Sequence, residues 1–454
     1  MRQYARSLRI FYALHWFVAL DSGGRRAKIV FRRLSCVSRV LEDEIVGATR
    51  GKAHIRMGTL VSCLLVTAAG FLAASVTVFF LEIVAATASS QWQRPDGTNR
   101  DVRQHVAVLV PAHNESSGLL PTLANIRSQL LPGDRLLVVA DNCSDDTGPV
   151  GRAGGAEVVE RNDPTKRGKG YALDWGVRHL TSNPPAIVII IDADCKLVDG
   201  AIDSLALTCG KTRRPVQALY LMTAPADPQI NQQVAEFSWR VKNWLRPLGL
   251  RALELPCQLM GTGMAFPWEL IRSADLANAQ IVEDLKLGLD LTLAGHPPVF
   301  CPSARVTSEF ASSIKGAGTQ RKRWEQGHLD MILKTAPHLL AIAISRRDRD
   351  LLALTLDLAV PPLSLLGMLV FGTFGLSLLN AILSDSITAL AISTTSLLAF
   401  TVASLLAWLK CGRDVVPASA FLLIPSYVFR KLKLYRQFVL GRVDSGWNRT
   451  DRTK

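Results

Sequence analysis

Three long stretches of the chain contain no charged side chain: Met57–Leu81, Leu358–Leu383 and Ile387–Leu409. A helix needs about 20 apolar residues to cross the hydrocarbon core of a bilayer, and a buried helix of a soluble protein rarely stays uncharged over that length. The pattern therefore predicts one membrane-spanning helix near the N-terminus and two near the C-terminus. Pro361 and Pro362 predict an irregular start to the second span rather than a break within it.

Between the first and second stretches, short apolar runs alternate with amphipathic segments, which predicts a βα sheet. The runs are rich in Val, Ile and Leu without polar alternation, as in parallel strands covered on both faces. The expected strands are His105–Val110, Asp134–Ala140, Ala156–Glu160 and Ala186–Ile191, with helices at Gly118–Leu131 and Gly170–Leu180.

The net charge of +14 has two interpretations. A nucleic-acid-binding protein would show a basic face interleaved with aromatic residues, or a known module, and the chain has neither. Lys and Arg flank the predicted spans instead, which favours contact with anionic lipid at the cytoplasmic surface. We therefore expect membrane lipid, and no nucleic acid, among the partners. Asp357 is expected at the membrane interface, where a carboxylate costs little.

Eight cysteines are scattered without C-x-x-C spacing or an accompanying His cluster. This usage predicts reduced, mostly structural thiols and does not indicate zinc. Cys143 and Cys195 fall inside the segments expected to carry the chemistry.

Acidic and polar residues follow three of the expected strands, at Pro111–Glu115, Asp141–Asp146 and Asp192–Asp194. Open α/β sheets bind ligands at the carboxyl ends of their strands. Carboxylates gathered there repel one another unless a cation or the donors of a ligand balance them. A nucleotide-sugar diphosphate with Mg²⁺ or Mn²⁺ supplies that balance, because these metals take one or two carboxylates plus phosphate oxygens. Asp192 and Asp194 are the expected metal ligands.

Five motifs, in order, make the chain resemble the family 2 glycosyltransferases of GT-A fold over about residues 105–335. The family includes cellulose and chitin synthases and exopolysaccharide glycosyltransferases. The resemblance implies an α/β fold, a Rossmann-like GT-A nucleotide-sugar-binding domain flanked by transmembrane helices. The motifs are P-x-x-N-E at Pro111–Glu115, D-x-x-x-D at Asp141–Asp145, D-x-D at Asp192–Asp194, the pair Glu283-Asp284, and Q-x-x-R-W at Gln320–Trp324.

The resemblance also implies a role for each motif. Glu115 and Asp141 would hold the base and ribose, and Asp192 and Asp194 the ribose, diphosphate and metal. Asp284 would deprotonate the acceptor hydroxyl, Arg323 would face the diphosphate, and Trp324 and Gln320 would bind the acceptor sugar.

One general base suffices for this reaction, because the attacking sugar hydroxyl must lose its proton as the nucleoside diphosphate leaves. A second carboxylic acid is unnecessary where a metal and an Arg stabilise the leaving group, unlike in glycoside hydrolysis. Attack from the opposite face inverts the anomeric carbon, so a UDP-α-sugar would give a β-linkage. The alternative for Glu283-Asp284 is an ordinary helix N-terminus. Glu283 is the weaker candidate, because neighbouring helix residues point in different directions.

Two glycine-containing segments are further candidates. Lys166–Gly170 precedes a helix and could bring backbone N–H groups and the Lys169 ammonium to a diphosphate. Gly261, Thr262 and Gly263 would let the backbone approach the acceptor sugar closely. The alternatives are a solvated loop and a tight turn.

Basic residues mix with Trp and Leu at Glu236–Leu253 and again at Val415–Phe438. Such a mixture favours helices lying in the membrane interface, close to a lipid-linked acceptor. A core helix is the alternative for the first of them. His328, after the Q-x-x-R-W motif, is expected to be structural.

These elements predict five parts on a multi-pass protein of the inner (plasma) membrane. They are a basic segment at 1–56, an anchor helix at 57–88, a cytosolic GT-A domain at 100–335 after the polar linker Gln91–Arg103, a transmembrane hairpin at 351–410, and an interfacial helix with a basic cytosolic tail at 415–454. Residues 1–56 carry 12 Lys and Arg against 4 acids. Because the domain at 100–335 is expected to be cytosolic, the anchor helix would place residues 1–56 outside the membrane. An excess of Lys and Arg conflicts with that location, since basic residues favour the cytoplasmic side. We therefore expect this segment to be absent from the mature protein or dispensable, with Met57 as a start.

The expected activity is inverting transfer from a nucleotide-sugar, UDP-linked, to a glycan or lipid-linked acceptor in exopolysaccharide or envelope glycan biosynthesis. A processive β-glycan synthase and a non-catalytic nucleotide-sugar-binding scaffold are the alternatives. Three spans are few to line a channel for a polar glycan, so addition of one residue per acceptor is expected. Assembly with other envelope polysaccharide proteins is left open.

Overall fold

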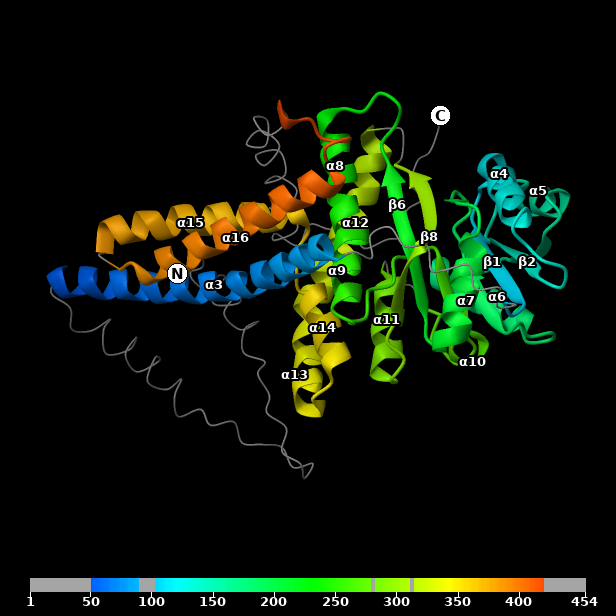
Figure 1. Ribbon diagram of the computed structural model, residues 1–454, viewed down its shortest axis with the longest axis horizontal. Helices are drawn as coiled ribbons and strands as arrows, with labels where there is room; N and C mark the ends of the chain where they lie inside the picture. The colour runs from blue at the N-terminus through cyan, green and yellow to red at the C-terminus, as the bar shows by residue number, and fades with distance from the viewer. Residues whose placement is uncertain (1–49, 90–102, 279–281, 311–313, 385, 420–454) are drawn as a thin grey trace.

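The computed structural model describes residues 50–89, 103–278, 282–310, 314–384 and 386–419. Three long helices lie together at one end of the molecule, and a mixed sheet with its covering helices lies at the other (Figure 1). The long helices are α3 (Arg50–Ala88), α15 (Leu363–Ser384) and α16 (Thr388–Cys411). Within them Gly58–Ala88, Leu363–Ser384 and Thr388–Cys411 are long and apolar enough to cross a membrane. The three predicted spans are therefore confirmed by length and composition, with ends shifted by a few residues.

The two ends of this helical bundle have different neighbours. At the end away from the sheet, Asn380 Nδ2 of α15 donates to Ser62 Oγ of α3 at 3.1 Å. At the end beside the sheet, Arg240 Nη1 donates to Cys411 O at the end of α16, at 3.1 Å. The turn between α15 and α16 therefore lies beside the amino-terminal half of α3, and the carboxyl-terminal end of α3 faces the sheet. Residues 1–49 lie outside the described residues.

The second span starts irregularly, as predicted. Helix α14 (Arg349–Leu358) ends before Pro361 and Pro362, and α15 begins directly after them. The carbonyl of Pro362 then accepts from the amides of Leu365 and Leu366, at 2.8 and 2.9 Å. The prolines thus separate two helices and start the second one.

The sheet has the strand order β3-β2-β1-β4-β7-β6-β8-β5. Strands β1 to β4 pair in parallel, and antiparallel pairs enter from β7 onward. The four predicted strands are confirmed with shifted ends, whereas the mixed half of the sheet was not predicted. The strands are β1 (Val106–Ala112), β2 (Arg135–Asp141), β3 (Glu157–Arg161), β4 (Ile187–Ile190), β5 (Lys196–Leu197), β6 (Val216–Thr223), β7 (Met264–Pro267) and β8 (Val299–Glu309).

Both faces of the sheet are covered by helices. Val106, Val108 and Val110 of β1 face one apolar core, and Ala107 and Leu109 face another. Burial on both sides explains why the strand shows no polar alternation. The covering helices and their neighbours are α4 (Ser116–Arg127), α5 (Thr147–Ala153), α6 (Lys169–Leu180), α7 (Ala201–Thr212), α10 (Trp268–Ile271), α11 (Glu283–Leu293), α12 (Ile314–Lys334) and α13 (Ala336–Arg346).

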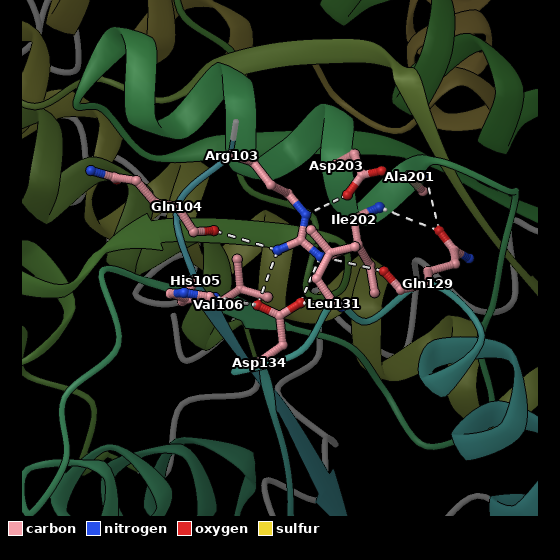
Figure 2. A network of polar contacts seen from close by, with 10 residues as sticks. All are labelled: Arg103, Gln104, His105, Val106, Gln129, Leu131, Asp134, Ala201, Ile202 and Asp203. Atoms are coloured by element: carbon pink, nitrogen blue, oxygen red, sulfur yellow. Dashed lines mark hydrogen bonds and ion pairs between the residues drawn. The ribbon is translucent and has the colours of Figure 1, made fainter. Parts of the chain in front are cut away.

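A buried arginine, Arg103, connects three segments at the amino-terminal ends of the strands, away from the carboxyl ends that carry the acidic motifs. Arg103 Nη2 pairs with Asp134 Oδ2 at 2.6 Å, and its Nε pairs with Asp203 of α7 (Figure 2). Asp134 Oδ1 also accepts from the Val106 amide at 3.0 Å. Arg103 is therefore part of the sheet domain rather than the end of the predicted polar linker, because it is buried and pairs with carboxylates from two distant segments.

The Trp- and Arg-rich segment Glu236–Leu253 forms α8 (Ile230–Arg240), a π-helical turn η2 (Val241–Leu245) and α9 (Arg246–Ala252). These elements stand between the bundle and the sheet (Figure 1). Much of η2 and most of α9 are buried. A Cβ at Gly249 would lie 1.9 Å from the Glu82 carbonyl oxygen of α3. The prediction of an interfacial helix is therefore wrong here, and the alternative of a core helix is confirmed.

Internal partners account for two of the arginines of this segment, Arg240 and Arg246. Arg246 lies between Glu82 of α3 and Asp357 of α14, with both nitrogen–oxygen distances at 2.6 Å. Arg240 pairs with Glu236 at 2.8 Å and with Asp414 at 2.7 Å. Asp357 is thus buried in an ion pair rather than exposed at a membrane interface. The second mixed segment, Val415–Phe438, lies outside the described residues from position 420 onward.

Candidate active site

The carboxyl ends of β1, β2 and β4 enclose a hollow of about 190 Å³, here called the strand-end cavity. β1 lies between β2 and β4. The strand order reverses at β1, because the chain continues to β2 and β3 on one side and to β4 on the other, and open α/β sheets bind ligands at such a point. The acidic tips predicted from the sequence are therefore brought together. The lining comprises Pro111, Ala112, His113, Glu115, Asp141, Gly168, Lys169, Ala172, Asp192, Ala193 and Asp194.

The loops after β1 and β2 support each other. Asn114 and Asn142 adopt positive φ angles of 54° and 52°, a conformation that Asn tolerates better than most residues. Asn114 Oδ1 accepts from the Ser144 amide at 2.7 Å, and the Glu115 amide donates to Thr147 Oγ1 at 2.9 Å. The asparagine of the P-x-x-N-E motif thus shapes the turn that presents Glu115.

Asp141 is buried and pairs with Arg161 Nη1 at 2.5 Å. Arg161 ends β3 directly beside Asp141 in the parallel register. The sequence interpretation did not include Arg161, although it follows the predicted third strand by one residue. The Arg161 guanidinium also lies 5.4 Å from the centre of the Tyr171 ring. An arginine therefore orients the carboxylate that the resemblance assigns to the nucleoside.

Asp192 and Asp194 lie where the sequence placed them, directly after β4. One oxygen of each lies within 4.8 Å of the other and of the Cys195 sulfur. The Asp192 amide donates to Thr262 Oγ1 at 3.0 Å, which fixes the loop. Burial raises the pKa of Cys195 well above its usual value. The two carboxylates are the hard oxygen ligands that Mg²⁺ and Mn²⁺ prefer, whereas a thiol is a softer ligand.

Lys169 connects the strand ends to the next segment of the site. Its ammonium pairs with Asp192 and donates to the Gly261 carbonyl at 2.7 Å. Burial lowers the pKa of Lys169, but the Asp192 and Glu283 carboxylates outweigh that effect and hold it above the usual value. Lys169 is thus a fixed cation among carboxylates.

A second hollow of about 230 Å³, here called the central cavity, adjoins the first. Both are lined by Gly168, Lys169, Asp192 and Asp194. The central cavity is also lined by Gly261, Glu283, Asp284, Gln320 and Trp324, from the expected acceptor and catalytic segments, and by Arg323, which is expected to face the diphosphate. Residues from Gly168 to Trp324 therefore face one space.

Glu283 and Asp284 both line the central cavity. They are the first two residues of α11, so both side chains lie at its amino-terminal end. Burial raises the pKa of Glu283 to about 8, and the neighbouring Asp284 carboxylate adds to the rise. Burial also raises the pKa of Asp284, while Lys169 opposes the rise. Both side chains nevertheless line one cavity, so Glu283 belongs to the candidate site beside Asp284.

The segment Gly261–Gly263 divides between the cavity and the core. Gly261, with φ of +88°, lines the cavity, and a Cβ there would lie 3.4 Å from Asp284 Oδ2. Thr262 is fully buried. Gly263 lies against Ala218 and Val306, 2.8 and 2.9 Å from a built Cβ. Thr262 and Gly263 therefore pack beneath the cavity lining, because their segment leads into β7. Of the three residues, only Gly261 is positioned to approach an acceptor.

Trp324 is half-buried rather than exposed, and its ring centre lies 5.1 Å from that of Trp239 of α8. The sequence interpretation missed Trp239, whose only signal was the aromatic content of its segment. Gln320 is buried. His328 is buried, contacts the Leu358 carbonyl at 3.0 Å, and has its pKa lowered to about 3 by burial. These contacts agree with the predicted structural role of His328.

An open α/β sheet with acidic strand ends, a lysine among them and an adjoining carboxylate-lined cavity defines a nucleotide-diphosphate-dependent transferase of the GT-A class. Residues 103–327 match the family described as "Glycosyltransferase like family 2". A Mycobacterium tuberculosis protein named as an uncharacterized glycosyltransferase is 31% identical over 194 residues, 39% of this chain and 82% of the relative. The chain belongs to the family 2 glycosyltransferases, enzymes that transfer sugar from nucleotide-sugars.

Other similar proteins cover less or are more distant. A Bacillus subtilis protein, named as the probable glycosyltransferase YdaM, is 26% identical over 248 residues. The match spans 50% of this chain and just over half, 56%, of the Bacillus protein. A solved mannosyltransferase of Pyrobaculum calidifontis, in complex with GDP-Man and Mn²⁺, is 18% identical, with a TM-score of 0.46, and the match covers 84% of this chain and 100% of that one.

Proposed function

We propose that this glycosyltransferase inverts the anomeric carbon as it moves a sugar from a UDP-linked donor to a membrane-associated glycan or lipid-linked acceptor. The product linkage is β, and the setting is exopolysaccharide or envelope glycan biosynthesis. The observation that carries the proposal is the placement of the D-x-D aspartates and Asp284 on one cavity. The three apolar helices support a multi-pass protein of the plasma membrane, with residues 100–335 as its cytosolic domain.

The donor would bind with its nucleoside in the strand-end cavity, near Glu115 and Asp141, and its sugar toward the central cavity. Asp192 and Asp194 would hold Mg²⁺ or Mn²⁺, which when bound neutralises charge on the leaving diphosphate. Lys169 lines both the strand-end and the central cavity, and Arg323 lines the central cavity. Both cations would stabilise the same diphosphate. Lys169 would then exchange its contact with Asp192 for a phosphate oxygen.

The acceptor would bind in the central cavity, with a sugar ring against Trp324. A hydroxyl beside Asp284 would lose its proton to that carboxylate while it attacks the anomeric carbon, and the bond to the diphosphate would break on the opposite face. The raised pKa of Asp284 suits a base, because a more basic carboxylate accepts the proton more readily.

The donor is tested with purified full-length protein in lipid nanodiscs and a panel of nucleotide-sugars. UDP-linked donors are expected to bind and to release UDP when membrane lipid extract is supplied. Product length is measured on the same samples, and one added sugar per acceptor is expected. Long polymer from donor alone would favour a processive synthase. Binding without any release of nucleotide would favour the non-catalytic scaffold.

Removal of divalent metal is expected to abolish transfer, because the metal neutralises charge on the leaving diphosphate. Two carboxylates offer too few oxygens for a metal shell, so the metal should bind only when the phosphates are present. Metal binding measured by calorimetry should be weak for the protein alone and should tighten when UDP is present. Asp194→Asn should remove this UDP-linked metal binding, whereas Asp199→Asn, outside the cavities, should retain it. Full activity in excess chelator, or tight metal binding without nucleotide, would contradict the assignment.

A further inference from the structure

A third hollow of about 110 Å³, here called the apolar cavity, lies between the helical bundle and the sheet domain. One wall comes from Phe79 of α3 and from Leu363 and Leu366 at the start of α15. These residues belong to the helices that are long and apolar enough to cross a membrane. The remaining lining includes Ala235, Val241, Phe310, Val360, Pro361 and Pro362. The cavity thus borders the segments expected to contact hydrocarbon.

The apolar cavity adjoins the central cavity. Trp239, Lys242, Arg246, Trp324 and His328 line both. The strand-end, central and apolar cavities therefore form a series that runs from the acidic strand ends to the bundle. A nucleotide-sugar fits the first end of this series by its charge. The last end is lined mostly by apolar side chains, with Ser238, Glu325 and Ser364 among its few polar residues, and it suits a hydrocarbon chain better than a polar glycan.

Lys242 differs from the other polar residues at this boundary. Arg246 pairs with two carboxylates, His328 contacts a carbonyl, and Trp239 Nε1 donates to the Tyr220 carbonyl at 3.2 Å. Within the described part of the chain, the Lys242 ammonium makes no hydrogen bond and no ion pair. Lys242 is exposed rather than buried, and it lines both cavities. Its ammonium is therefore open to a charge-assisted contact with an anion bound at their boundary.

We propose that Lys242 binds the phosphate of a lipid-linked acceptor sugar, a sugar joined through phosphate to a single hydrocarbon chain. The chain lies in the apolar cavity and enters from the bilayer between α3 and α15. The sugar lies against Trp324 and Trp239, with its hydroxyl toward Asp284. A cavity of about 110 Å³ bordered by two spans accommodates one chain rather than two side by side. This inference rests on the proposed function and names the acceptor class.

The test compares two synthetic acceptors that carry the same sugar, one on polyprenyl diphosphate and one on the neutral polyprenyl alcohol. Lys242→Gln is expected to raise KM for the phosphate-containing acceptor about 10-fold or more, since it removes a charge-assisted contact. KM for the neutral acceptor should not change, and Lys242→Arg should restore most of the loss. Lys334→Gln, an exposed lysine of α12 outside the cavities, is the matched control.

Chain binding is tested separately with Ala235→Phe, which fills the apolar cavity. The unmodified protein should show a KM that falls as the polyprenyl chain lengthens, and Ala235→Phe should lose this dependence. Equal effects of Lys242→Gln on both acceptors, or none on either, would overturn the inference. Nucleotide-sugar binding is measured on every variant, so failure of the protein to bind any donor would overturn the proposed function instead. Polymer formation that uses neither acceptor would also overturn the inference.

Discussion

Asp284→Asn is expected to lower turnover by at least about 10²-fold while nucleotide-sugar binding stays within a few-fold. The amide keeps the size of the side chain but cannot accept the proton of the acceptor hydroxyl. Turnover is measured as sugar transfer at saturating donor and acceptor, and donor binding is measured by calorimetry. Near-normal turnover of the Asn variant would remove Asp284 from the mechanism.

The neighbouring carboxylate provides the control. Glu283→Gln should cost less than Asp284→Asn. Burial and the Asp284 carboxylate raise the pKa of Glu283 to about 8, so Glu283 is neutral while Asp284 loses its proton, and Gln should leave the pKa of Asp284 nearly unchanged. A base acts when deprotonated, so kcat/KM for the acceptor should rise with pH through the raised pKa of this pair. In Glu283→Gln that rise should stay at nearly the same pH. The opposite ranking of the two variants would assign the base to Glu283.

Arg246→Met is expected to destabilise the protein by about 3–5 kcal/mol, because it leaves Glu82 and Asp357 buried without their cation. Arg246 connects α3, α9 and α14, so its loss should also loosen the bundle from the sheet domain. Stability is measured by denaturant unfolding of the purified protein in detergent. Arg178→Met, at an exposed arginine paired with Asp174, should change stability by less than about 1 kcal/mol.

A triple variant separates charge from packing. Glu82→Gln and Asp357→Asn, combined with Arg246→Met, remove the uncompensated charges and should recover much of the lost stability. If Arg246→Met alone is as stable as Arg178→Met, the buried ion pairs do not hold the bundle to the domain.

Local features of the sequence determined the framework of this protein. Uncharged length alone identifies the spans, because hydrocarbon excludes charged side chains. Unbroken runs of apolar residues identify β1, β2 and β4, because both faces of a parallel sheet are buried. The acidic motifs meet because the carboxyl ends of parallel strands share an edge. The sequence alone therefore predicts that the proposed donor residues Glu115, Asp141, Asp192 and Asp194 lie together.

The tertiary structure decided where the same residue types find their partners. The Arg-rich segment Glu236–Leu253 has the composition of a lipid-facing helix, yet Arg246 pairs with carboxylates 164 and 111 positions away. Arg161 and Trp239 join the site only because folding brings them beside Asp141 and Trp324. Periodicity along a chain records which positions are apolar or polar, but it carries no information about which distant charge or ring will face them. Burial, the raised pKa of Glu283 and the series of three cavities all arise from those distant contacts.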